Sequence, residues 1–143
     1  MGFKEYLEAE EQNDKIRAAS CIEVPKGTVL INRNGTSKTS PKCKNCGAWI
    51  DHWHELSGLP IPADGDCPVE GCDGCSKEGV IQPIEGCHVM IKGEGKMVYI
   101  APLCKPCNHL ADGAEMTLSR ATLLVQANVA QTCDRLVDTS KLI

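Results

Sequence analysis

The spacing of apolar residues predicts a helix at the start of the chain. Residues 2–19 place Tyr6 and Leu7 about one helical turn after Phe3, in a segment rich in Glu, Ala, Lys and Arg. We expect this helix to pack against the rest of the protein. A partner-binding role for the helix is the second interpretation.

Short strands are predicted on either side of the central region. Residues 21–32 indicate two strands separated by a turn at Pro25-Lys26-Gly27. Residues 89–91 and 97–100 are apolar and flank the glycine-rich sequence 92–96, which is typical of a β-hairpin. Near the end of the chain, a strand over 121–127 and a short helix over 129–137 are expected.

The stretch 43–109 has a different character. It holds most of the cysteines. All four histidines and seven of the eight prolines lie between 41 and 109, and we expect the polar residues 33–42 before it to form an exposed loop. We expect turns, short hairpins and metal knuckles there in place of regular helix. The chain is thus divided into 1–42 with the N-terminal helix and strands, 43–110 as a zinc-binding lobe, and 111–143 packed on the same domain.

Composition limits both the core and the location of the protein. Ten cysteines but only five aromatic residues occur among 143, so a modest aliphatic core needs further support. The chain has no apolar run long enough for a membrane helix and begins with an acidic, non-apolar segment. We therefore expect a cytoplasmic protein without membrane contact, in which cysteine pairs are metal ligands before they are disulfides.

Charge argues against a broad nucleic-acid surface. The net charge is −4, and residues 59–75 hold four acidic and no basic side chains. The best basic strip lies around Arg33, Lys38, Lys42 and Lys44, and a solvated loop is its simpler explanation.

Three C-x-x-C pairs and one wider pair predict structural zinc, because two thiolates on a tight turn point at one tetrahedral centre. The most strongly indicated ligands are Cys43, Cys46, Cys67, Cys72, Cys104 and Cys107. Two tetrahedral sites need eight ligands, and the remaining candidates are Cys75, Cys87, His52, His54 and His88.

The sequence leaves two groupings of these ligands open. In the first, one metal is held by Cys67, Cys72, Cys104 and Cys107, while Cys43 and Cys46 take partners from His52, His54 and Cys75. In the second, Cys43 and Cys46 join Cys104 and Cys107, and the other site is Cys67, Cys72, Cys75 and Cys87. The isolated Cys21 and Cys133 are expected to be small buried apolar residues.

Two tryptophans stand beside two of the histidines. Trp49 and Trp53 would share one face of a helix, next to His52 and His54. With so few aromatic residues available, we expect the tryptophans to form the core of the zinc lobe. An aromatic platform for a base or a peptide is the alternative.

The central sequence resembles the HNH-type treble clef. The resemblance rests on Gly86-Cys87-His88-Val89, the hairpin after it, and Tyr99-Ile100-Ala101-Pro102-Leu103-Cys104-Lys105-Pro106-Cys107-Asn108-His109. The longer pattern, from Cys43-x-x-Cys46-Gly through His52-Trp53 to this motif, is similar to a small group of uncharacterised bacterial or phage proteins.

This resemblance implies a knuckle, a hairpin and a short helix around one structural zinc, with a catalytic divalent ion such as Mg²⁺ beside a histidine. It assigns His88 as the general base and Asn108 as a residue of the catalytic ion site. Cys87 stands where the family has an acidic ligand.

Taken together, the sequence predicts a small α+β domain stabilised by zinc, with a treble-clef-like centre, an N-terminal helix and a C-terminal strand and helix. The first functional hypothesis is a non-catalytic zinc-binding module for protein or nucleic-acid partners. An HNH-like metal-dependent nuclease using His88 is the alternative, and a dithiol redox protein using Cys104 and Cys107 is the third.

Overall fold

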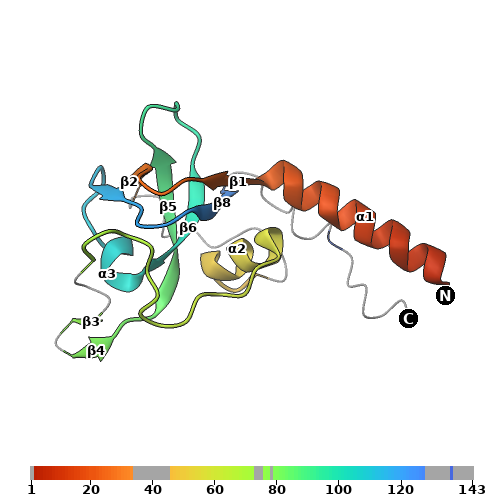
Figure 1. The fold of residues 1–143 in the computed structure, drawn as a ribbon, viewed down its shortest axis with the longest axis horizontal. Helices are drawn as coiled ribbons and strands as arrows, with labels where there is room; N and C mark the ends of the chain where they lie inside the picture. The colour runs from red at the N-terminus through yellow and green to blue at the C-terminus, as the bar shows by residue number, and fades with distance from the viewer. Residues whose placement is uncertain (1, 34–45, 73–75, 78, 128–135, 137–143) are drawn as a thin grey trace.

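The computed structural model describes residues 2–33, 46–72, 76–77, 79–127 and 136. Within them the chain is a mixed α+β protein built on a curled antiparallel sheet (Figure 1). The helices are α1 (Phe3–Ser20), α2 (Trp49–Ser57) and α3 (Lys105–Asn108). The strands are β1 (Cys21–Val24), β2 (Val29–Asn32), β3 (Ser76–Lys77), β4 (Val80–Ile81), β5 (Ile84–Ile91), β6 (Tyr99–Cys104), β7 (Glu115–Thr117) and β8 (Thr122–Gln126).

The six-stranded sheet has the order β1-β8-β6-β5-β2-β7, and β3 and β4 form a separate two-stranded hairpin. The strands predicted within 21–32, 89–100 and 121–127 are confirmed. β1 and β2 follow one another in sequence but do not pair: Cys21 lies opposite Val125, and Leu30 lies opposite Ile91. Because the short turn between β1 and β2 joins distant positions of one sheet, the sheet must curl.

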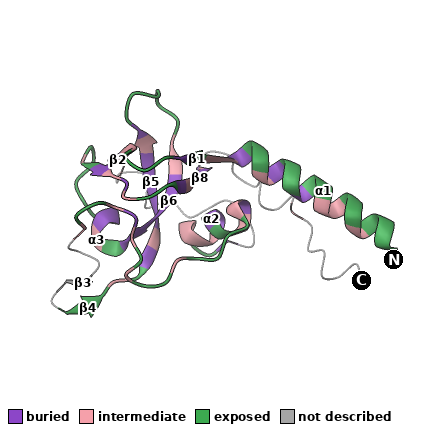
Figure 2. Cartoon of the chain, in the orientation of Figure 1, coloured by how far each residue is buried: buried purple, intermediate pink, exposed green. Residues whose placement is uncertain are grey.

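The hairpin of β5 and β6 is the centre of this sheet. Its register pairs Val89 with Tyr99 and Ile84 with Cys104, so β6 ends beside the start of β5. Both strands are largely buried along their length, as Figure 2 shows. The sequence after β6 turns at once into α3, which places the cysteines of this turn beside the hairpin.

Helix α2 covers one side of the β5–β6 hairpin and corrects the expectation that residues 43–109 contain no regular helix. The Asp51 carboxylate accepts a hydrogen bond from the Ala48 N–H (3.0 Å) at its start. At its end Gly58 adopts φ 72°, a left-handed conformation that suits glycine. Trp53 and Leu56 of α2 are buried against β6 and β8. The helical spacing of Trp49 and Trp53 was the sign of this helix within a segment dense in Cys, Gly and Pro.

The N-terminal helix predicted over 2–19 is confirmed as α1, but only its second half packs on the body of the protein. Asn13, Ile16 and Ser20 are buried, whereas Phe3 and Leu7 are exposed at the end that projects away from the sheet (Figures 1 and 2). The helix predicted over 129–137 lies outside the described residues, apart from position 136. Within the part of the chain that is described, no helix is long and apolar enough to cross a membrane.

Candidate metal centre

Four cysteine side chains converge at the open end of the β5–β6 hairpin. Cys67 and Cys72 come from the segment between α2 and β3, Cys104 is the last residue of β6, and Cys107 lies in α3. Their four Sγ atoms all lie within 4.8 Å of one another. Two sequence segments about 30 residues apart therefore bring one pair of thiols each to a common centre.

The sulfur geometry suits a tetrahedral ion. The Sγ–Sγ distances are 3.3 Å from Cys72 to Cys107, 3.4 Å from Cys72 to Cys104 and 3.9 Å from Cys67 to Cys107. Four sulfur atoms at about 2.3 Å from a central Zn²⁺ would be about 3.8 Å apart. A disulfide would need a separation of about 2.05 Å, and all four cysteines are free thiols.

Backbone hydrogen bonds set the first pair of thiols in place. The Cys72 N–H donates to the Val69 carbonyl (3.3 Å), and Gly71 between them has φ 67°. This tight turn is anchored on the sheet side, since the N–H of Ser119 donates to the Pro68 carbonyl (2.7 Å). The knuckle around Cys67 and Cys72 is therefore tied to the core through the chain after β7.

The second pair of thiols is positioned by the junction of β6 and α3. The Cys104 N–H donates to Cys67 Sγ (3.4 Å), a bond that joins the two segments directly and favours a charged sulfur. Pro106 lies in the first turn of α3, where its missing N–H costs no helical hydrogen bond. Cys104 and Cys107 are both buried, while Cys67 and Cys72 are partly exposed.

Hydrogen bonds and burial within the cluster shift the pKa of Cys67, Cys104 and Cys107. The hydrogen bond with Cys107, reinforced by the Cys104 and Val69 N–H groups, lowers the pKa of Cys67 to about 5 despite its burial. The pKa of Cys107 is raised, mainly through its hydrogen bond with Cys67, and burial raises the pKa of Cys104 to about 11. One thiolate is thus already favoured among the four sulfur atoms, and a bound cation would favour deprotonation of the rest.

The remaining ligand candidates do not join this cluster within the described residues. Cys87 is fully buried, and its Sγ lies 3.5 Å from Asn32 Oδ1. Cys46 is buried in a different apolar cluster, with Trp53 and Leu56. The cluster therefore matches the first of the two groupings. Cys43 and Cys75 lie outside the described residues, as does Cys133.

The candidate histidines are held by other contacts. His52 is buried, and its Nε2 lies 3.3 Å from the Gln126 carbonyl. His54 is exposed, with Nδ1 2.6 Å from the Leu59 carbonyl. Trp53 fills the core beneath α2 and donates from Nε1 to the Leu123 carbonyl (2.8 Å), in keeping with the expected core role of the tryptophans.

His88 lies beneath α2, on the part of β5 that this helix covers. Only 3% of the residue is exposed, and the Trp49 ring meets its imidazole edge-on at a centroid distance of 4.5 Å. Burial, with a smaller effect of the nearby His52, lowers the pKa of His88 to about 4. Among the described residues its Nδ1 has no hydrogen-bond partner. The imidazole is therefore a neutral, enclosed group.

Asn108 lies at the end of α3 and contacts a residue that sequence reasoning missed. Its Nδ2 donates to Glu85 Oε1 (2.8 Å), and His109 Nε2 is 3.3 Å from the same oxygen. Glu85 comes two residues before Cys87, outside any recognisable motif. Only the pairing of β5 with the end of β6 reveals that Glu85 reaches α3.

Comparisons with protein-family models, with curated proteins and with solved structures gave no match to this chain. The assignment of function therefore rests on the site itself.

Proposed function

We propose that the protein is a non-catalytic zinc-binding module, in which Cys67, Cys72, Cys104 and Cys107 hold one structural zinc ion. The observation that carries this proposal is the convergence of their four Sγ atoms within 4.8 Å. The role of the ion is to fix the surface around it for contact with a protein or nucleic acid.

The donor set favours zinc in a structural role. Four thiolates are typical of closed tetrahedral zinc sites, whereas Mg²⁺ and Ca²⁺ prefer oxygen ligands. A catalytic zinc site keeps one coordination position open for water, and here four protein ligands would fill all positions. The ion would join the 67–72 knuckle to α3.

A treble-clef-like centre belongs to the same proposal. The order of knuckle, β5–β6 hairpin and short helix α3 along the chain supports it, since this is the order that the resemblance implies. The second zinc ion, on Cys43 and Cys46, stays a prediction.

The test is metal content by elemental analysis and native mass spectrometry of the full chain. We expect the wild type to hold zinc and Cys72→Ser to lose one zinc per chain. The matched variant is Cys87→Ser, because Cys87 belongs only to the second grouping of ligands. Retention of that zinc by Cys72→Ser, or its loss from Cys87→Ser, would contradict the proposed ligand set.

The nuclease alternative stays second because of the surroundings of His88. A general base must reach the proton it removes, and Trp49 and β5 enclose this imidazole. DNA cleavage that needs added Mn²⁺ and disappears in His88→Ala, with zinc content and melting unchanged, would reverse this order. The redox alternative would be favoured by reversible dithiol oxidation of Cys104 and Cys107 without loss of metal.

A further inference from the structure

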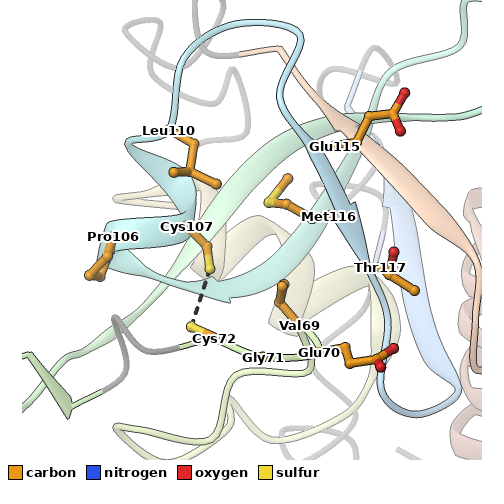
Figure 3. A pocket seen from close by; sticks show the side chains of 10 residues that line it. All are labelled: Val69, Glu70, Gly71, Cys72, Pro106, Cys107, Leu110, Glu115, Met116 and Thr117. Carbon is orange, nitrogen blue, oxygen red and sulfur yellow. Dashed lines mark hydrogen bonds between the residues drawn. The ribbon is translucent and has the colours of Figure 1, made fainter.

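A groove of about 590 Å³ runs between β7 and the cysteine cluster (Figure 3). Its volume lies in the range of pockets that bind ligands. One side is the edge of β7, and the other is formed by the 69–72 knuckle and the start of α3. In Figure 3 the sulfur atoms of Cys72 and Cys107 lie at one side of this groove, so the metal centre borders it directly.

The β7 edge of the groove has backbone groups directed into it. β7 is the end strand of its sheet. Just after β7, on the side that faces β2, the N–H of Leu118 donates to the Thr28 carbonyl (2.9 Å). Because backbone groups alternate sides along an antiparallel strand, those of Glu115 and Thr117 point away from β2. The Thr117 carbonyl accepts from the N–H of Glu70 (2.7 Å), which begins a pairing on this side. No described strand continues that pairing along Glu115.

The side chains around the groove combine an apolar floor with negative charge. The carboxylates are Glu70 and Glu115, near the two ends of β7 in Figure 3, and among the described residues no basic side chain lines the groove. Glu115 is paired with Lys92 (3.1 Å), whereas the Glu70 side chain makes no hydrogen bond or ion pair with the described residues. A zinc ion with four thiolates adds a net charge of about −2. The apolar lining residues include Val69, Leu110 and Met116.

We propose that this groove binds an extended basic segment of a partner protein, whose backbone pairs with the Glu115 end of β7. The peptide backbone bonds to the outward N–H and carbonyl of Glu115, because Glu70 already occupies the place opposite Thr117. A Lys or Arg side chain meets Glu70, and an apolar side chain covers Met116. This inference rests on the proposed zinc site, because the ion fixes the knuckle that carries Glu70. Nucleic acid is disfavoured here, since its phosphates would face carboxylates and charged sulfur.

The experiment uses the full-length, zinc-loaded protein and a positional-scanning library of immobilised seven-residue peptides with capped ends. We expect Lys or Arg to raise binding at one or more positions and Asp or Glu to lower it. For the best peptide, Glu70→Lys should weaken affinity about tenfold or more. The matched control is Glu94→Lys, the same charge change at an exposed position in the β5–β6 turn, which should leave affinity unchanged.

Strand addition is tested separately with N-methylated versions of the selected peptide. Methylation of the one amide that donates to the Glu115 carbonyl should abolish binding, whereas methylation of the two neighbouring amides, which face away from β7, should not. The inference is overturned if the library shows no basic preference, if Glu70→Lys binds like wild type, or if no single methylation abolishes binding. A 20-nucleotide DNA that competes with the peptide and binds more tightly than the peptide would also overturn the inference.

Zinc content, measured on the same samples, distinguishes the two proposals. If the protein holds the proposed zinc ion but binds no peptide, only the partner assignment is overturned. A metal-free wild type would overturn the proposed function, whatever the peptides do.

Discussion

The two sides of the β5–β6 hairpin are held by different means. On one side, the nine-residue helix α2 buries Trp53 and Leu56 against the sheet, so apolar burial is enough to hold this helix. At the open end, the 67–72 knuckle and the four-residue α3 present mainly cysteines to each other. Isolated helices of this length are unstable in water. On the proposed zinc site, metal–sulfur bonds would stabilise the open end, whereas side-chain packing stabilises its neighbour on the same hairpin.

Removal of the metal should give the largest effect and should act first on the sulfur side. Structural zinc sites contribute about 10–16 kcal/mol of binding free energy, which is comparable with the stability of a whole domain. With a strong chelator we expect hydrogen-exchange protection of 67–72 and 104–109 to disappear and the melting temperature to fall by about 10 °C or more. Both tryptophans lie on α2, so their fluorescence reports the other side separately.

The matched control for this experiment is the chelator added to Cys72→Ser, which should change nothing further. Unchanged far-UV circular dichroism and melting after complete removal of metal would contradict the assignment of folding energy to the cluster. Simultaneous loss of protection and tryptophan signal would show that the two sides unfold as one unit.

Gly86→Ala should lower the stability of the α2 side without affecting the cysteine cluster. A Cβ atom at this position would lie 2.5 Å from the Trp49 carbonyl carbon and 2.6 Å from the Ile50 nitrogen, so the helix must shift. We expect a loss of about 3 kcal/mol in denaturant unfolding, a changed tryptophan emission and an unchanged zinc content. The control is Gly93→Ala in the hairpin turn, where no atom is close and only the backbone angle is strained, at a cost of about 1 kcal/mol. Equal losses of stability in the two variants would show that the close approach of α2 to Gly86 does not determine the cost of the substitution.

Acid should weaken the α2 side through His88. Its pKa is lowered to about 4 in the folded protein, against 6.5 when solvated, so the unfolded chain binds the proton more readily. Stability from the neutral imidazole is therefore complete above pH 6.5 and is lost as the pH falls toward 4, by about 2–3 kcal/mol. The measurement is urea unfolding at pH 7 and 4.5 for wild type and His88→Gln.

The comparison with His88→Gln removes contributions that both proteins share, including protonation of the cysteine ligands and of His52. The variant should lose less stability than wild type over this pH interval. An identical loss in both proteins would mean that the imidazole is not kept neutral by its surroundings.

Much of the fold could be predicted because local pattern and final structure agree. The N-terminal helix, the glycine turn between β5 and β6 and the strand before Ala127 all follow from spacing within a few residues. The curl of the sheet could not be predicted, since β1 and β2 look like a hairpin and their separation depends on pairing with β8 and β5. α2 was indicated only by the helical spacing of Trp49 and Trp53, because turn residues surround it in the sequence.

The candidate site was predictable in kind but not in detail. Paired cysteines indicate metal without knowledge of the fold, yet the choice between two groupings depends on which segments meet. That choice follows from the β5–β6 register, which places Cys104 beside Ile84 and the knuckle beside α3. His88 shows the converse: a motif position indicated catalysis, whereas the packing of Trp49 around it could be seen only in three dimensions.

The smallest effect on stability is expected from Cys21→Ser, which compares a cysteine of the apolar side with those of the cluster. Cys21 is partly buried, its thiol donates to the Leu56 carbonyl (3.1 Å), and burial raises its pKa to about 11. A serine hydroxyl can donate to the same carbonyl, so we expect a loss below about 1 kcal/mol and full zinc content. Loss of zinc in this variant would show that Cys21 acts beyond its local packing.

The same contrast predicts the order of thiol alkylation. Only an accessible thiolate reacts rapidly; removal of the metal should expose Cys67, whereas burial raises the pKa of Cys21 to about 11 and keeps it a protonated thiol. Iodoacetamide followed by peptide mass spectrometry should therefore label Cys67 first after chelation, leave it protected when zinc is bound, and label Cys21 slowly in both states. If Cys21 and Cys67 reacted alike in both states, the sulfur cluster would not bind metal, and the difference between the two sides of the hairpin would be one of position alone.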